Sequence, residues 1–166
     1  MEVGGFLTKL EDDYSLISKK QPIFEKTGNK NSHYQIDDCF FRFWFRFVYR
    51  NQALVELRNY PQLLELAGRD FTVFTGYALE RYFFWKFVEE QKYVRMGGWW
   101  DRKGENEIDL LCERALDGAY DVYEVKRDAE RFRRDALNLK VAVFLDKNPS
   151  LKNRTFNLLG LSVADM

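Results

Sequence analysis

The chain has 166 residues, of which 46% are hydrophobic and 31% charged, and its acidic and basic residues balance to a net charge of zero. A chain of this length can bury roughly 70% of its unfolded surface, so we expect one main domain. Zero net charge excludes the whole-molecule attraction that draws basic proteins to nucleic acid, and any such binding has to depend on local patches.

Charged residues interrupt every apolar run before the roughly 18 residues of a membrane span. The first ten residues include an acid and lack the features of a secretion signal. We therefore predict a soluble, cytoplasmic protein. Cys39 and Cys112 lie far apart in apolar stretches, which predicts buried free thiols. Together with His33 they are too few for structural zinc.

The start of the chain has the element order of half a winged helix. Helical spacing predicts a helix over residues 3–14, and strands are expected at 15–18 and 32–36 on either side of a polar turn at 25–31. Residues 1–36 are therefore predicted to be a partial winged helix. Because its first helices are missing, we expect a chain that is incomplete at its start.

Residues 37–68 are predicted to be a helical connector. Asp37 and Asp38 suit a helix N-terminus, because a carboxylate there can accept a hydrogen bond from a free backbone amide and interacts favourably with the helix dipole. The aromatic run at 39–49 follows as a helix. A second short helix is expected over 62–67, with Gly68 as its stop.

Three arginines, Arg42, Arg46 and Arg50, recur every four residues within the aromatic run. They share one helix face. The remaining aromatic residues are expected to pack: Phe40, Phe43, Trp44 and Phe47. The favoured interpretation is a solvated face, and a phosphate-binding stripe is the alternative.

Residues 69–166 begin with a long helix, predicted over 70–91, that is apolar on nearly every side. Glu80 lies in the middle of this helix, among the apolar residues. A carboxylate there is costly unless it is paired, hydrogen-bonded or bound to metal. A neighbour such as Arg81 or Lys86 is the alternative partner.

Beyond this helix the sequence predicts three strands, a helix and a final strand, at residues 93–100, 105–113, 119–127, 128–142 and 155–159. Residues 143–145 either continue the second helix or start an extended segment. This order suits an α/β domain with a mixed sheet and helices against it, because the final strand has to arrive through a helical crossover.

The hairpin formed by the second and third of these strands carries the chemistry. Folding about its turn sets Asp109 opposite Glu124, with Lys126 on the same face as Glu124. Opposed Cβ atoms lie about 5 Å apart, so the two carboxylates can share one Mg²⁺ or Mn²⁺ together with the carbonyl of Val125. Such an ion makes water nucleophilic and neutralises phosphate charge. Lys126 can orient that water, and Glu80 is a third carboxylate if its helix packs under the hairpin.

A solvated hairpin is the alternative, because exposed strands alternate charged residues routinely. The apolar neighbours of Asp109 and Glu124 favour burial instead. Basic residues near the strand ends are candidates for backbone phosphates, or are simply solvated: Arg102, Lys103 and Arg127.

Several motifs occur together in the chain: Tyr34-x-Ile36-x-Asp38-x-Phe40-Phe41-Arg42-Phe43-Trp44, Gly76-x-x-Leu79-Glu80, Trp99-Trp100-Asp101-Arg102, Glu107-Ile108-Asp109-Leu110 and Glu124-Val125-Lys126. With them the whole chain resembles the C-terminal domain of unknown function attached to archaeal-type AAA ATPases. Residues 69–159 resemble the PD-(D/E)XK, or restriction-endonuclease-like, nuclease fold. Asp109 matches the acid of its second core strand, Glu124 and Lys126 its paired motif, and Glu80 the helix glutamate of the resolvase-like branch. Ile108 replaces the proline that precedes the acid in the family pattern.

The resemblance implies a divalent-metal-dependent nuclease-like domain that processes DNA as the C-terminal part of an AAA-type ATPase. The chain has no Gly-x-x-x-x-Gly-Lys-Ser/Thr loop, so we predict no ATP site within it. The alternative is an inactive nuclease fold that binds DNA or the ATPase as a regulatory module. A third interpretation is a structural piece whose exposed aromatic residues await partner domains and form homo-oligomers in isolation.

Overall fold

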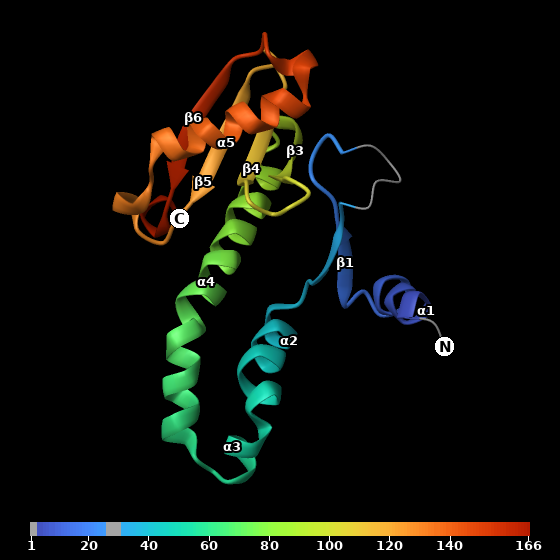
Figure 1. The fold of residues 1–166 in the computed structure, drawn as a ribbon, viewed down its shortest axis with the longest axis vertical. Helices are drawn as coiled ribbons and strands as arrows, with labels where there is room; N and C mark the ends of the chain where they lie inside the picture. The colour runs from blue at the N-terminus through green and yellow to red at the C-terminus, as the bar shows by residue number, and fades with distance from the viewer. Residues whose placement is uncertain (1–2, 26–30) are drawn as a thin grey trace. The chain divides into compact units, whose positions relative to one another are not determined.

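The computed structural model describes residues 3–25 and 31–166 (Figure 1). The chain divides into two compact units, named here the N-terminal unit, Met1–Lys20 with Ser32–Thr75, and the sheet unit, Gln21–Asn31 with Gly76–Met166. The division into residues 1–36, 37–68 and 69–166 stays a prediction. Each unit is described by itself below.

The N-terminal unit begins with the helix and two strands that the sequence predicts. Helix α1 (Val3–Thr8) continues into a π-helical turn, Lys9–Asp13. Strand β1 (Ile17–Lys20) then pairs antiparallel with β2 (His33–Ile36). Most of the predicted polar turn between them lies outside the described residues.

Helix α2 (Cys39–Phe43) begins where the sequence predicts, because the Asp38 carboxylate accepts a hydrogen bond of 2.9 Å from the Phe41 amide. The helical path continues as a π-turn, a 3₁₀ turn and then α3: Trp44–Val48, Tyr49–Asn51 and Gln52–Glu56. Phe47 is buried as expected, whereas Phe40 is 63% exposed. The predicted burial of Cys39 is also wrong, because Cys39 is exposed, while Cys112 is buried.

Helix α4 (Tyr60–Glu90) is continuous, so the predicted short helix that stops at Gly68 is wrong. A glycine inside a helix costs only about 1 kcal/mol relative to alanine. Contacts beyond Gly68 offset this cost, since the rings of Phe47 and Phe74 meet at 5.3 Å within the N-terminal unit. Among the helices of the described ranges, none has the length and hydropathy to cross a membrane.

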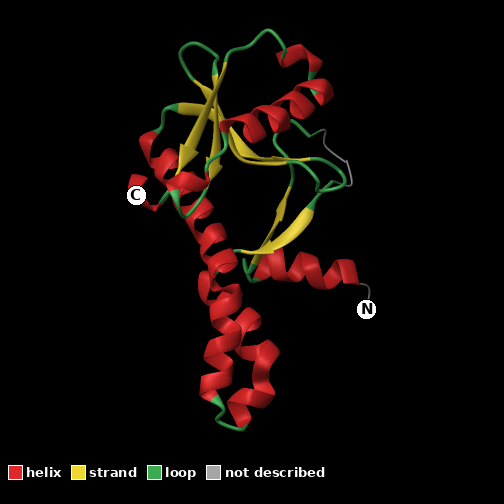
Figure 2. Cartoon of the chain, turned by 60° about the vertical axis from the view of Figure 1, so that its left-hand side comes forward, coloured by secondary structure: helices red, strands yellow, loops and turns green. Residues whose placement is uncertain are grey.

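The sheet unit contains a mixed four-stranded sheet in the order β3-β4-β5-β6, as the element order predicts (Figure 2). Its strands are β3 (Tyr93–Trp100), β4 (Glu107–Arg114), β5 (Tyr120–Val125) and β6 (Phe156–Leu161). The first three are antiparallel neighbours, and β6 lies parallel to β5. The crossover between β5 and β6 contains α5 (Arg134–Lys147).

Helix α5 starts six residues later than predicted, at Arg134 rather than Asp128. Asp128 instead caps a short 3₁₀ turn, Ala129–Arg131, by accepting a hydrogen bond from the Glu130 amide. Residues 143–145 continue the helix. Two further 3₁₀ turns, Pro149–Leu151 and Val163–Asp165, flank β6.

The two helices of the sheet unit cover opposite faces of the sheet (Figures 1 and 2). On one face α5 packs with Leu137, Val141 and Phe144 against Trp99, Ile108, Leu111, Tyr120 and Val122. On the other, α4 packs with Leu79, Phe83 and Phe87 against Leu110, Cys112, Tyr123 and Val125. Each face removes a set of large apolar side chains from water, which is the main stabilising term of the unit.

Strand β4 contains a β-bulge next to the predicted site. Gly97 pairs with Leu111 and Trp99 with Ile108, so β4 has one more residue than β3 over this stretch. As a result Ile108 and Leu111 both face α5, although they are three residues apart. A β-bulge changes the direction in which nearby side chains point. Asp109 lies within this bulge, between Ile108 and Leu111.

Candidate functional site

Glu124 lies near the end of β5 and is only 7% exposed. Two lysines contact the same carboxylate oxygen: the Nζ atoms of Lys126 and Lys140 lie 2.8 Å and 3.1 Å from Glu124 Oε1. The other oxygen, Oε2, is buried and has no hydrogen-bond partner among the residues that the structure describes. Burial raises the pKa of Glu124, but the two lysines outweigh it and keep that pKa below its usual value.

Asp109 lies next to Glu124, as the hairpin geometry predicts. The β4–β5 register ends at the pair of Leu110 with Tyr123, and Asp109 and Glu124 are the next residue of each strand. Their charges lie close enough to interact. The Val125 amide donates a hydrogen bond of 2.7 Å to Asp109 Oδ2. Burial raises the pKa of Asp109, and this effect and the nearby charge of Glu124 exceed the opposing effects of the Val125 amide and the two lysines.

Lys126 stands among the predicted acids. Burial by itself lowers the pKa of Lys126, but the hydrogen bond with Glu124 and the negative charges of Asp109, Glu124 and Glu80 raise it above its ordinary value. Glu80 is half-buried on α4, and its charge acts on Lys126. Lys86, the alternative partner for Glu80, donates to the backbone carbonyl of Asp165. The fold thus brings together the side chains that the sequence predicts for the site.

We call Asp109, Glu124, Lys126 and Lys140 the acid–lysine cluster. Within the described part of the chain, no three His, Cys, Asp or Glu side chains gather closely enough to hold a metal ion. Mg²⁺ nevertheless binds proteins through one or two carboxylates and keeps several waters. Two interacting carboxylates, Asp109 and Glu124, fit that requirement, since Oε2 of Glu124 has no hydrogen-bond partner among the described residues.

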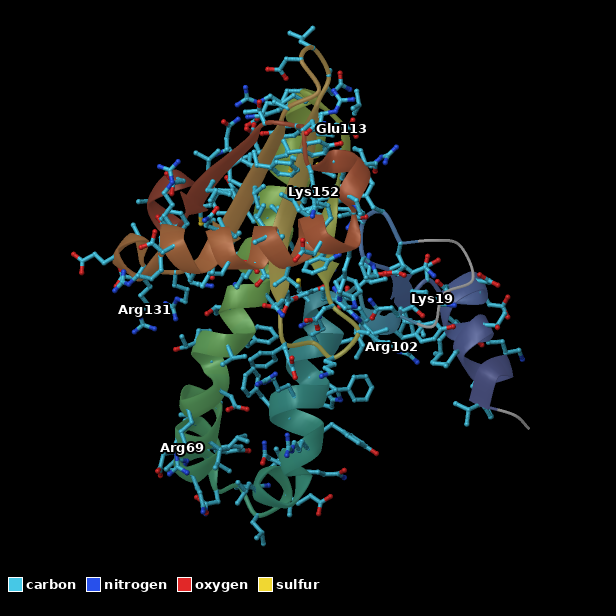
Figure 3. The ribbon with its side chains drawn as sticks, turned by 45° about the horizontal axis from the view of Figure 1, so that its top comes forward. Lys19, Arg69, Arg102, Glu113, Arg131 and Lys152 are labelled. Carbon is cyan, nitrogen blue, oxygen red and sulfur yellow. The ribbon has the colours of Figure 1, made fainter. Side chains whose placement is uncertain are left out.

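The predicted phosphate contacts come from two separate loops. Arg102 and Lys103 lie exposed in the loop between β3 and β4, and Arg127 lies exposed in the connection from β5 to α5. Figure 3 shows Arg131, in this second connection, well away from Arg102. The two loops therefore do not form one basic patch.

Asp101 gives the first of these loops its shape. Its Oδ1 accepts hydrogen bonds from the amides of Lys103 and Glu105, and its Oδ2 accepts one from the Asn106 side chain. The side chain of Asn106 is the main reason that the pKa of Asp101 is lowered. Next to the loop, Arg102 lines a cavity of about 360 Å³ with Trp99, Trp100 and Lys147 among its other lining residues.

Lys140 is the residue of the cluster that the sequence interpretation missed. It lies on α5 in the same stripe as the buried residues Leu137, Val141 and Phe144. A lysine on the inner edge of a buried helix face needs a partner of opposite charge. That position was the available signal, but the sequence does not show which acid α5 packs against.

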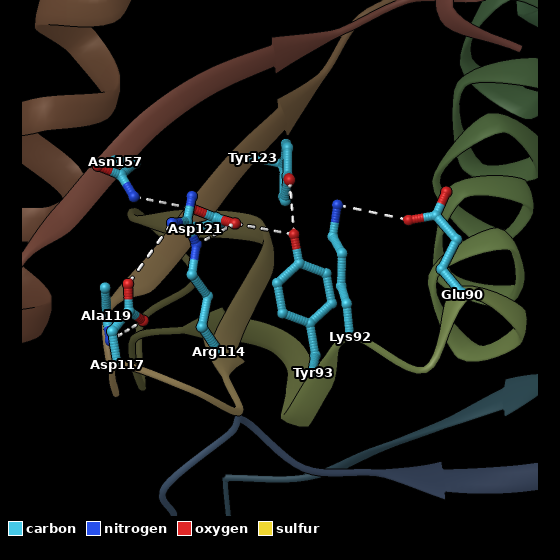
Figure 4. A network of polar contacts seen from close by, with 9 residues as sticks. All are labelled: Glu90, Lys92, Tyr93, Arg114, Asp117, Ala119, Asp121, Tyr123 and Asn157. Carbon is cyan, nitrogen blue, oxygen red and sulfur yellow. Dashed lines mark hydrogen bonds and ion pairs between the residues drawn. The ribbon is translucent and has the colours of Figure 1, made fainter.

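A second buried acid, Asp121, was also missed, and it organises the opposite end of β5 (Figure 4). The Arg114 guanidinium donates two hydrogen bonds to its carboxylate, at 2.9 Å and 2.7 Å. Tyr93 and Asn157 each donate one more at 2.9 Å, and the Tyr93 hydroxyl also contacts that of Tyr123. In the sequence, the available signal was an aspartate among the strand-forming apolar residues Tyr120, Val122 and Tyr123. In the structure all six residues of β5 are buried.

Burial and the hydrogen bonds with Tyr123 and Asp121 raise the pKa of Tyr93 far above its ordinary value. Burial raises the pKa of Tyr123 to about 12. For Asp121, burial raises the pKa, but the hydrogen bonds from Arg114, Asn157 and Tyr93 outweigh it and hold the pKa below the usual range. Asp121 is therefore an anion at neutral pH, and its tyrosine neighbours are neutral there.

Comparison with known proteins gives one curated relative and one family. Over 147 residues the chain is 28% identical to the uncharacterized protein MJECL04 of Methanocaldococcus jannaschii, in an alignment that covers 81% of this chain and 33% of the relative. The chain thus spans about one third of that relative's length. No solved structure matches it.

Residues 44–136 match the family described as "Archaea bacterial proteins of unknown function", DUF234. This stretch is more than half of the chain and contains Glu80, Asp109, Glu124 and Lys126. The chain belongs to this family.

Proposed function

We propose that the chain is a divalent-metal-dependent, nuclease-type domain that processes DNA, and that its core has the restriction-endonuclease-like fold. The observation that carries the proposal is Glu124, a buried carboxylate with one orphaned oxygen, beside Asp109 and two lysines. The order helix, three strands, helix and strand in the sheet unit supports the same fold. A fold by itself does not establish an activity, so the argument rests on the site.

Asp109 and Glu124 would hold the Mg²⁺ or Mn²⁺ ion, with the Val125 carbonyl as a third ligand. When bound, the ion supplies an activated water and neutralises charge on the phosphodiester. Lys126 acts as a hydrogen-bond donor to the water or to a phosphate oxygen, and not as a base, because its acidic neighbours keep it protonated. Glu80 helps to hold the Lys126 charge in place.

The exposed residues Arg102, Lys103 and Arg127 would contact backbone phosphates away from the cleaved bond. Because they lie in separate loops, they suit two stretches of DNA backbone better than one phosphate. The alignment covers only 33% of the archaeal relative, which supports a larger protein. The AAA-type ATPase domain in the same chain is part of the proposal and comes from the resemblance of the sequence motifs. The ATP would bind to that domain, because the chain itself lacks a phosphate-binding loop.

Cleavage of branched and single-stranded DNA in Mg²⁺ or Mn²⁺ tests the proposal. Asp109→Asn is expected to lower the cleavage rate by about 100-fold or more, since it removes charge at the reacting centre. Asp146→Asn is the matched control, because Asp146 is an exposed aspartate on α5 that pairs with Lys152. Equal rates for the wild type and Asp109→Asn would remove Asp109 from the mechanism.

A second candidate function is a nuclease fold without turnover that binds DNA or the ATPase domain as a regulatory module. The contact of two lysines with Glu124 favours it, because the cluster is then balanced without a metal. In that case no DNA cleavage is expected with either ion, and calorimetry is expected to show no binding of Mg²⁺ or Mn²⁺.

A further inference from the structure

The acid–lysine cluster contains one more lysine than Glu124 needs. Lys126 lies 2.8 Å from Glu124 Oε1 and directly follows the end of β5, two residues away from Glu124. Lys140 lies 3.1 Å from the same oxygen and comes from α5, 16 residues along the chain. Neither lysine contacts Oε2, which has no hydrogen-bond partner among the described residues.

The two lysines differ in how they are held. Lys126 experiences the negative charges of Asp109, Glu124 and Glu80, and its backbone amide donates to the Leu161 carbonyl. Both lysines are partly exposed, Lys140 at 26% and Lys126 at 35%, so exposure does not distinguish them. They differ in the negative charge around them: Lys126 lies closer to Glu124, Glu80 acts on it as well, and Asp109 interacts with it more strongly than with Lys140. Moving the Lys140 ammonium group toward water therefore costs less than moving that of Lys126.

Without a bound ion, the two carboxylates of the cluster face two ammonium groups, and Glu80 adds a further negative charge near Lys126. A divalent cation that binds to Glu124 and Asp109 adds two positive charges close to both lysines. Like charges at such short distances repel strongly where water is largely excluded. One ammonium group then has to move away, and Lys140 is the less firmly held.

We propose that Lys140 is a built-in competitor of the metal: it occupies Glu124 in the metal-free protein and is displaced when a divalent cation binds. This inference rests on the proposed metal site. It gives Lys140 a role in setting metal affinity, apart from any contact with substrate. Mn²⁺ binding is then weaker than the two carboxylates alone would allow.

Calorimetric titration of the full chain with MnCl₂ tests the inference without an activity assay. Lys140→Met removes the charge and keeps much of the stem, so we expect Mn²⁺ to bind at least about fivefold more tightly than to the wild type. Lys140→Arg keeps the charge and can also reach Oε2 through a second hydrogen bond, so we expect weaker Mn²⁺ binding. Lys147→Met is the matched control, because it removes an exposed lysine two turns further along α5 and should leave Mn²⁺ affinity unchanged.

Thermal unfolding with and without MnCl₂ shows whether each variant is folded and gives a second measure of binding, since a ligand stabilises the state that binds it. Lys140→Met is expected to gain more stability from MnCl₂ than the wild type does. If Mn²⁺ binds the wild type and both Lys140 variants equally, or binds Lys140→Met more weakly, this inference fails and the metal site stands. If Mn²⁺ binds none of them, the proposed metal-dependent function fails together with the inference.

Discussion

Strand β5 carries two buried acids, Asp121 and Glu124, that face opposite sides of the sheet and differ in how they are satisfied. Asp121, 3% exposed, accepts hydrogen bonds at both oxygens from Arg114, Tyr93 and Asn157. Glu124, 7% exposed, has two lysines at one oxygen and no hydrogen-bond partner at the other among the described residues.

This difference separates a structural role from a functional one. Buried polar atoms are nearly always hydrogen-bonded, so a complete network such as that of Asp121 indicates stability, and an orphaned oxygen calls for an explanation. The Asp121 network takes one side chain from each strand of the sheet and joins all four. The acid–lysine cluster instead leaves an oxygen open beside a second carboxylate, which is the arrangement that a bound cation would complete.

The largest difference in stability is expected when Asp121 and Glu124 are each replaced by the uncharged amide of the same shape. Asp121→Asn is expected to lower the free energy of unfolding by about 2–3 kcal/mol, because its new amide group meets donors from Arg114, Tyr93 and Asn157. The water-exposed Arg114 keeps the loss from being larger. Glu124→Gln is expected to cost less, about 1 kcal/mol, since the carbonyl oxygen of glutamine still accepts from Lys126 and Lys140, whose ammonium groups also reach water. Urea unfolding measures both, and equal losses would contradict the comparison.

A smaller difference is expected in how the stability of the wild type and of Asp121→Asn depends on pH in acid. The pKa of Asp121 is lower in the folded protein than in the unfolded chain, so its contribution is fully present above the ordinary value of about 3.9 and is lost as the pH falls through the folded pKa. We expect Asp121→Asn to lose less stability than the wild type between pH 5 and pH 2. Identical acid slopes for the two proteins, measured by urea unfolding at each pH, would argue against the Asp121 network as the source.

The smallest expected effect is a gain of stability at the acid–lysine cluster. Burial raises the pKa of Asp109, so the folded state loses stability as the pH rises from the ordinary carboxyl value through the raised folded pKa. Asp109→Asn removes this loss and can still accept the hydrogen bond from Val125. We expect it to raise the free energy of unfolding by about 0.5–1 kcal/mol at pH 7, and by less at pH 3.

Thermal unfolding of wild type and Asp109→Asn at both pH values measures the gain. A loss of stability at pH 7 would show that Asp109 supports the fold as an anion, as Asp121 does. Such a result would remove the distinction between the two regions.

The sequence predicts the elements that depend on local patterns. Alternating apolar residues and the turn at Gly118 locate the hairpin, and its register then brings Asp109 and Glu124 together just beyond the pair of Leu110 with Tyr123. The strand period of two sets Lys126 beside Glu124. The prediction fails at Gly68, where a local helix-stop signal is overridden by packing on either side of it.

By itself, then, the sequence determined the order of helices and strands, the mixed sheet and the pairing of Asp109 with Glu124. Only the tertiary structure decided that Lys140 joins Glu124, that the side chains around Asp121 come from four strands, and that one oxygen of Glu124 stays open. The physical reason is distance along the chain. Helix and strand periods act between near neighbours, whereas these contacts form only after α5 has crossed the sheet and β6 has paired with β5.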